Sequence, residues 1–133
     1  LSPDGARAYV TARGENNLLV FDTNKLVSDS AHALIGRVPV GTAPVGVAVV
    51  DDGRKIILTN SNRFAGSAAD HQELTIVDAT RVREGAAAVI GKIPAGGFPR
   101  ELRVTADGKA LLVTNFTSKT LEIVDLGRAL AGK

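Results

Sequence analysis

The sequence predicts an all-β fold made of a repeated four-stranded antiparallel unit, and three observations carry this prediction. The composition is 44% hydrophobic but only 4% aromatic, which favours strands packed by Val, Ile, Leu and Ala. Turns with the pattern x-Asp-Gly occur three times, each before a strand-like segment in the same register. Further segments alternate aliphatic and other residues with a period of two, as strands do. Units of about 40–50 residues with four strands each indicate the blades of a β-propeller.

The x-Asp-Gly turns mark where the units repeat. They lie at Pro3–Gly5, Asp51–Gly53 and Ala106–Gly108. A tetrad begins four residues after each glycine, at Tyr9–Ala12, Ile57–Asn60 and Leu112–Asn115. Because an Asp-Gly turn joins neighbouring strands, each tetrad is predicted to belong to the second strand of its blade.

Two further repeated segments predict the third and fourth strands. The third strands are expected at Leu18–Asp22, Leu74–Asp78 and Leu121–Asp125, whose first and third residues are aliphatic. The fourth strands, each followed by a Pro-x-Gly-x-x-Pro loop, are expected within Ile35–Pro44 and Ile90–Pro99. These two loops are offset by 55 residues, the same spacing as the last two turns.

The order of these segments defines one β-propeller segment over residues 1–133. With the strands of a blade lettered A to D from the central channel outward, blade one has strands B to D over about 1–43. Blade two is complete over about 44–95, with strands near 45–50, 55–60, 73–78 and 88–94. Blade three has strands A to C over about 96–133. The fold class is therefore a partial β-propeller with one complete and two truncated blades, and residues 23–33 form an outer loop with a helical turn.

The tetrads, the turns and the Pro-x-Gly-x-x-Pro loops together resemble the YVTN family of β-propeller repeats over essentially the whole chain. The first tetrad ends in Ala12, and the other two begin with Ile57 and Leu112 instead of Tyr. The chain has no Trp and so departs from the WD40 signature, although the architecture is WD40-like. The resemblance implies a closed ring, commonly of seven blades, of the lactonase-like or surface-layer type. It also implies a periplasmic, secreted or cell-surface location.

Three blades cannot close a ring, so the expected partners are the remainder of the propeller or further copies of the chain. Bare strand edges and bare faces between blades both favour association. A piece of a longer protein is favoured over a ring of copies, because the truncations fall within blades.

Composition excludes several classes of site and partner. The formal charge of +2 comes from scattered residues without a basic stripe, so nucleic acid is not an expected partner. The chain has no cysteine, which excludes disulfides, thiolate catalysis and Cys-ligated metals. No apolar stretch reaches the roughly eighteen residues of a membrane span.

Strand direction places the B-to-C and D-to-A connections on one face of the disc, which we call the loop face. Its longest loop, 60–73, carries Arg63, Asp70 and His71, and Arg100 opens strand A of blade three where blade two has Val45. Clustered loops on a rigid scaffold are where ligands bind. The four candidate ligand-binding residues are therefore Arg100, His71, Arg63 and Asp70, for a protein partner or a small anionic ligand.

Other interpretations of these residues stand beside this one. One alternative is that the 60–73 segment is only a solvated polar loop. Another is that Arg100 or Arg103 forms an ion pair with Glu101 or with a neighbouring blade. Asp70, His71 and Glu73 make a weak metal pattern without a distant fourth ligand, so no metal site and no cofactor are predicted. Asn60 and Asn115, at the ends of two B strands, are expected to bond the loop backbone.

The sequence favours a non-catalytic binding or scaffold module of unknown ligand over an enzyme. No nucleophile with an acid–base pair can be named, and the neighbouring Ser28, Asp29 and His32 do not make a triad, which is assembled by geometry across a fold. The alternative is a lactonase-like propeller hydrolase. That alternative requires His71, Arg100 and a carboxylate to converge on a pocket at the channel.

Overall fold

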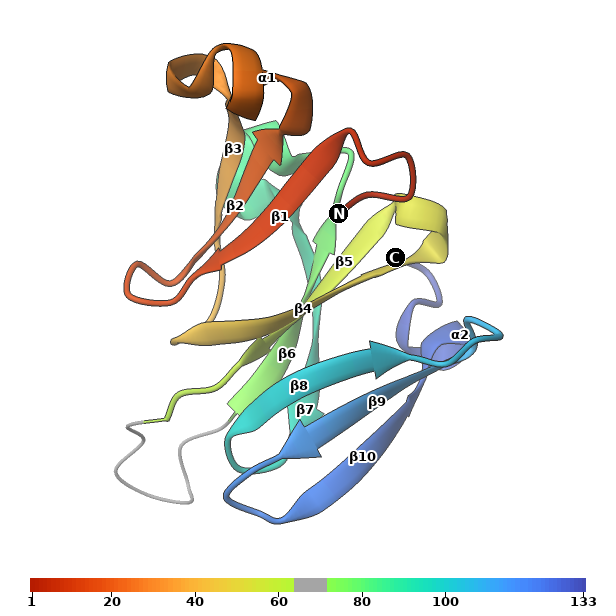
Figure 1. The fold of residues 1–133 in the computed structure, drawn as a ribbon. Helices are drawn as coiled ribbons and strands as arrows, with labels where there is room; N and C mark the ends of the chain where they lie inside the picture. Colours follow the sequence, from red (N-terminus) through yellow and green to blue (C-terminus); the bar gives the residue numbers. More distant parts are fainter. Residues whose placement is uncertain (64–71) are drawn as a thin grey trace.

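The computed structural model describes residues 1–63 and 72–133, and strands dominate them (Figure 1). The first group is β1 (Arg7–Ala12), β2 (Asn17–Asp22) and β3 (Leu34–Pro39). The second group is β4 (Pro44–Val50), β5 (Lys55–Asn60), β6 (Gln72–Asp78) and β7 (Val89–Ala95). The third group is β8 (Pro99–Val104), β9 (Ala110–Asn115) and β10 (Thr120–Asp125). The helical segments are α1 (Thr23–Ser28), η1 (Ser30–His32), η2 (Asp51–Gly53), η3 (Val82–Ala88) and α2 (Leu126–Ala129).

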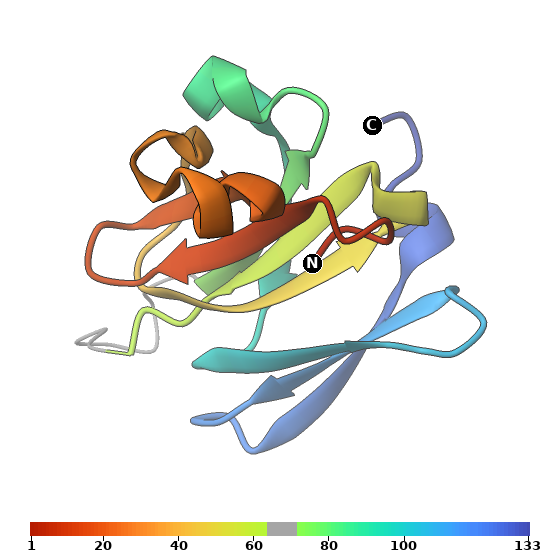
Figure 2. The same ribbon diagram turned by 45° about the horizontal axis from the view of Figure 1, so that its top comes forward.

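Each group of strands forms one antiparallel sheet. The sheet orders are β1-β2-β3, β4-β5-β6-β7 and β8-β9-β10, so neighbours in the chain are neighbours in the sheet. Figure 2 shows the three sheets as successive layers, with blade two between blade one and blade three. The chain is a partial β-propeller with one four-stranded and two three-stranded blades, and the predicted fold class is confirmed.

Blade two packs on both sides because its strands alternate. Ile56 and Leu58 of β5 lie in the core shared with blade one, whereas Ile57 between them lies in the core shared with blade three. All three side chains are fully buried. The period of two in the sequence thus divides the aliphatic residues of one strand between two cores.

The turns that mark the repeat depend on glycine in a left-handed conformation. Gly5, Gly53 and Gly108 have φ values of 71°, 87° and 70°, which carry little steric cost only for glycine. In the first and third turns the aspartate side chain also accepts a backbone hydrogen bond, Asp4 from Ala6 N and Asp107 from Lys109 N, both at 3.0 Å. The Asp-Gly pattern in the sequence is therefore explained by the backbone: glycine allows the positive φ, and aspartate accepts a hydrogen bond within two of the turns.

A threonine in strand B joins each blade to the next. Thr11 Oγ1 donates to the Val45 carbonyl at 2.9 Å, and Thr59 Oγ1 donates to the Arg100 carbonyl at 3.0 Å. Thr59 Oγ1 also accepts from Gly46 N at 2.7 Å. The two bonds that Thr11 and Thr59 donate cross from one sheet to the first strand of the next sheet, so these hydroxyls help to set how the blades are spaced.

The expected helical turn within residues 23–33 is α1. Asp22 caps its N-terminus by accepting from Asn24 N at 3.0 Å and Lys25 N at 3.2 Å, the usual role of an N-cap aspartate. Within the described residues, no helix has the length and apolar character needed to span a membrane.

Candidate functional site

The site lies at the loop face, on the side where the β1–β2, β3–β4, β7–β8 and β9–β10 connections lie (Figure 1). A cavity of about 290 Å³ opens there. Its lining consists of three arginines, two phenylalanines and one valine: Arg13, Val45, Arg63, Phe98, Arg100 and Phe116. These residues come from all three blades, so packing between sheets creates the cavity.

β-Bulges at equivalent positions shape the inner strands beside this cavity. The register of β4 against β5 shifts between Pro44 and Val47, and that of β8 against β9 shifts between Pro99 and Leu102. Arg100 therefore lies within a bulge, a feature that changes the direction of a side chain and is frequent next to binding sites. Proline as the first residue of each inner strand costs no ladder hydrogen bond there.

The loops that enter the inner strands have strained backbones held by defined hydrogen bonds. Ala43 and Phe98 precede the two prolines and have φ values of 52° and 57°, which are uncommon for residues other than glycine. Asn16 Oδ1 accepts from Ala43 N at 2.8 Å, and Gln72 Oε1 accepts from Phe98 N. These hydrogen bonds stabilise the strained backbone at the rim of the cavity and so hold the Phe98 side chain in one direction.

Phe98 uses this fixed backbone to form one wall of the cavity. Its ring packs edge to face against Phe116, with centroids 5.4 Å apart and an interplanar angle of 64°. Phe116 N donates to the Phe98 carbonyl at 2.8 Å, which ties the β9–β10 connection to the β7–β8 connection. The two rings are therefore placed together by backbone as well as by side-chain contact.

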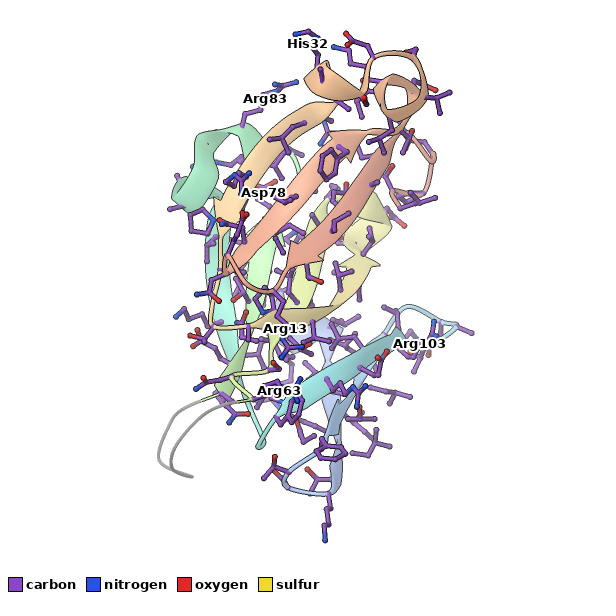
Figure 3. The ribbon with its side chains drawn as sticks, turned by 60° about the vertical axis from the view of Figure 1, so that its left-hand side comes forward. Arg13, His32, Arg63, Asp78, Arg83 and Arg103 are labelled. Atoms are coloured by element: carbon purple, nitrogen blue, oxygen red, sulfur yellow. The ribbon has the colours of Figure 1, made fainter. Side chains whose placement is uncertain are left out.

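Three arginines line the same cavity from different elements. Arg13 follows β1, Arg63 follows β5, and Arg100 is the second residue of β8. Figure 3 shows the side chains of Arg13 and Arg63 next to each other, whereas Arg103 lies farther along β8. No carboxylate is among the described residues that line the cavity. The described part of the lining is therefore basic and apolar.

The structure describes two of the four ligand-binding residues predicted from the sequence. Arg63 and Arg100 both line the cavity. Asp70 and His71 lie outside the described residues, so their convergence with Arg100 stays a prediction. The expected ion pair between Arg100 and Glu101 or a neighbouring blade is not found among the described residues. Both side chains are exposed, and water competes for such a pair.

Sequence reasoning missed Arg13, Phe98 and Phe116. Arg13 and Phe116 directly follow the first and third tetrads, where the second repeat has Ser61, and Phe98 stands where the previous loop has Ala43. Arg100 was found because it departs from the repeat at Val45, and the same comparison applied to the loops would have found the other three.

The sequence predicted the wrong hydrogen-bond partners for Asn60 and Asn115. Both are buried, but their Nδ2 groups donate to side chains of the next strand: Asn60 to Thr75 Oγ1 at 2.8 Å, Asn115 to Thr120 Oγ1 at 3.3 Å and Glu122 Oε2 at 3.2 Å. The close approach of the Pro-x-Gly-x-x-Pro loops explains this orientation. A Cβ at Gly41 would lie 2.5 Å from Asn60 Nδ2, so each loop covers its asparagine.

On the opposite face, Ser28, Asp29 and His32 do not form a catalytic triad. His32 Nδ1 lies 2.9 Å from Asp29 Oδ1 in an exposed pair, but Ser28 Oγ donates to the Asn24 carbonyl at 3.1 Å instead of to the imidazole. No group of three or more His, Asp or Glu side chains in the described part of the chain could hold a metal ion.

Comparison with known proteins identifies the architecture and not a family. No protein-family model matches the chain, and no curated protein sequence matches it. Among solved structures, hydrazine synthase of Kuenenia stuttgartiensis is similar with a TM-score of 0.76 and 21% identity over 97% of this chain and 32% of that one. A putative 6-phosphogluconolactonase of Bacteroides uniformis is similar with a TM-score of 0.71 and 19% identity over 94% and 34%.

A dihydro-heme d1 dehydrogenase, NirN, is similar with a TM-score of 0.53 and 17% identity over 97% of this chain and 34% of that one. These neighbours are β-propeller-type proteins with different activities, and at these identities they show the fold alone. The chain spans about a third of their length.

Proposed function

We propose that this chain is a segment of a larger YVTN-type β-propeller, and that its loop face binds a small anionic ligand without converting it. The observation that carries the proposal is the convergence of Arg13, Arg63 and Arg100 on one cavity of about 290 Å³. Arginines from three blades at one cavity can bind the same anion together, because each guanidinium is a fixed positive charge with several hydrogen-bond donors.

The chemistry of the lining defines the class of ligand. A guanidinium group forms two parallel hydrogen bonds to a carboxylate or a phosphate, which is why arginine is favoured where such groups are recognised. The Phe98–Phe116 pair adds an apolar wall beside the charges. The cavity volume of about 290 Å³ lies just below the range of about 300–1,000 Å³ for small-molecule sites. We therefore propose a metabolite-sized ligand with a phosphate or carboxylate group and a small apolar or ring-shaped body.

A lactonase-like hydrolase is the alternative, and one specific observation favours it. The Bacteroides uniformis neighbour is described as a putative 6-phosphogluconolactonase, and a phosphorylated substrate would suit the arginines of this cavity. Hydrolysis also needs a group that activates water or accepts a proton. The described lining residues offer no carboxylate, imidazole or hydroxyl for this step, which supports binding over catalysis. His71 is the residue on which the alternative depends.

Calorimetric titration with inorganic phosphate and with 6-phosphogluconate tests the proposal. Arg100→Gln should weaken binding by about tenfold or more, since a charge-assisted hydrogen bond contributes about 1.5–3 kcal/mol. Arg103→Gln is the matched control, because Arg103 is an exposed residue of the same strand that does not line the cavity. Equal losses in both variants would indicate unspecific attraction to a basic surface and contradict the proposal.

A second assay separates the two functions. The binding module should leave 6-phosphogluconolactone unchanged beyond its spontaneous hydrolysis. Accelerated hydrolysis that His71→Ala abolishes, with binding of 6-phosphogluconate retained, would instead establish the hydrolase.

A further inference from the structure

Two phenylalanines at the cavity depart from the internal repeat. Phe98 and Phe116 of blade three occupy the positions that Ala43 and Ser61 occupy in blade two. In both blades the later residue donates a backbone hydrogen bond to the earlier one: Ser61 N to the Ala43 carbonyl at 3.0 Å, and Phe116 N to the Phe98 carbonyl at 2.8 Å. Ala43 and Phe98 also have similar φ values, 52° and 57°. The same backbone structure therefore forms with or without aromatic side chains.

Folding does not explain why blade three carries two rings at these positions. Ala43 and Ser61 are 8% and 0% exposed, so small side chains complete this part of blade two. Phe116 is 63% exposed, although it is large and apolar and lines the cavity. Single exposed apolar residues are ordinary, but Phe116 packs against a second ring and is held by a backbone hydrogen bond. The pair is therefore a fixed aromatic surface that is suited to contact a ligand.

The geometry of the pair favours contact with a further ring. Its interplanar angle of 64° is that of an edge-to-face contact, in which the edge of one ring meets one face of the other. This contact leaves the remaining ring faces uncovered, and aromatic rings pack on such faces by offset stacking or edge to face. Arginine, which lines the same cavity three times, also packs on the face of an aromatic ring. The phenylalanines and arginines of the lining therefore both suit a ligand that carries an aromatic ring.

The same lining suits a sugar poorly. Each sugar hydroxyl donates a hydrogen bond, and burying a donor without an acceptor costs free energy. The described lining residues are Arg, Phe and Val, whose side chains accept no hydrogen bond. The volume limits the ligand further. An apolar cavity of about 150 Å³ holds benzene, so the cavity of about 290 Å³ has room for one ring and one anionic group.

We infer that the ligand of this cavity is a monocyclic aromatic anion, and that Phe116 determines the preference for its ring. The inference rests on the proposed function for the anionic group, which the arginines bind, and it specifies the body to which that group is attached. Phe116 is a specificity-determining residue: it contacts the ring of the ligand and does not alter the affinity for the anionic group alone.

Calorimetric titration with three phosphates tests this inference in the natural polypeptide that contains this sequence. The probes are inorganic phosphate, phenyl phosphate and cyclohexyl phosphate. The two esters have similar size and charge, but only phenyl phosphate is aromatic. Phenyl phosphate should bind about tenfold more tightly than cyclohexyl phosphate, because aromatic and cation–π contacts add to the affinity gained from buried apolar area. A lining that is only apolar would bind both esters equally.

Substitutions of Phe116 test whether this residue is the origin of the preference. Phe116→Leu keeps an apolar side chain but removes the ring, so it should lose most of the preference for phenyl phosphate and bind inorganic phosphate as before. Phe116→Tyr keeps the ring and should retain the preference. Phe21→Leu is the matched control, because Phe21 is a partly buried residue of β2 that does not line the cavity, and it should leave all three affinities unchanged.

Two results would overturn the inference. Equal binding of phenyl and cyclohexyl phosphate by the unsubstituted protein would show that the cavity does not recognise an aromatic ring. A preference that survives Phe116→Leu would show that Phe116 does not determine it. If the unsubstituted protein bound none of the three phosphates, the proposed anion site would itself be refuted, and this inference with it. That outcome is distinct from the other two, in which inorganic phosphate still binds.

Discussion

Replacing Thr59 by valine should loosen the junction between blades two and three while leaving its shape unchanged. Valine has nearly the volume of threonine but no hydroxyl, so the substitution removes the bond accepted from Gly46 N and the bond donated to the Arg100 carbonyl. Thr59 is fully buried, and water cannot replace the lost partner at its side chain.

The magnitude follows from these two bonds. Each contributes about 0.5–1.5 kcal/mol net, and a buried donor left without a partner adds to the loss. The free energy of unfolding should therefore fall by about 2–3 kcal/mol. With a urea m-value of about 2 kcal/mol/M, the unfolding midpoint should fall by about 1–1.5 M.

Urea unfolding followed by far-ultraviolet circular dichroism measures this change, since the chain has no Trp and a single Tyr. Thr59→Ser is the matched control, because it keeps the hydroxyl and removes one buried methyl group, at a cost of about 1 kcal/mol. The reasoning is refuted if valine costs less than serine, or if both leave the midpoint unchanged.

Two further predictions concern the same junction and the turn before β5. Gly46→Ala should lower the free energy of unfolding by about 1–3 kcal/mol, because the added Cβ would lie 2.4 Å from the Arg100 carbonyl oxygen. Gly14→Ala is the control and should change the urea midpoint little, because no atom lies within 4 Å of the added Cβ. Arg54 and Lys55 donate hydrogen bonds to the Asp51 carboxyl, and these bonds, that of Arg54 first, hold the pKa of Asp51 below its usual value. The stabilisation that they provide is therefore complete above about pH 4 and is lost as the pH falls through the folded-state pKa. Asp51→Asn should accordingly flatten the acid side of a plot of urea midpoint against pH, and an unchanged slope below about pH 4 would contradict this role.

The elements of the fold could be predicted because their causes are local. Alternation within β5 sets which side chains face each side of a sheet, and an Asp-Gly turn such as Asp107-Gly108 needs only its own backbone to form. The internal repeat also allows the three copies to be compared with one another, and their agreement tests each strand assignment without any other sequence. These signals predicted the three sheets and the helical turn after β2.

The candidate site could be predicted only in part, because it is made between blades. Arg63 and Arg100 were identified from a long loop and from a departure from the repeat. Arg13 and Phe116 meet them at one cavity only because the sheets pack at a particular spacing. The strained backbone at Phe98, with φ of 57°, follows from bonds to other loops and has no signature in its own residue type.

The sequence by itself determined the repeat, the strands and turns of each blade and the face on which the loops gather. Periodicity and turn chemistry act over a few residues, and this is why they can be read along the chain. Only the tertiary structure decided that three arginines and two phenylalanines line one cavity, and that Leu121 and Ile123 of β10 are exposed while their counterparts in β6, Leu74 and Ile76, are buried. Both results depend on contacts between separate sheets, whose spacing is set by buried aliphatic packing and by the threonine bonds from blade to blade.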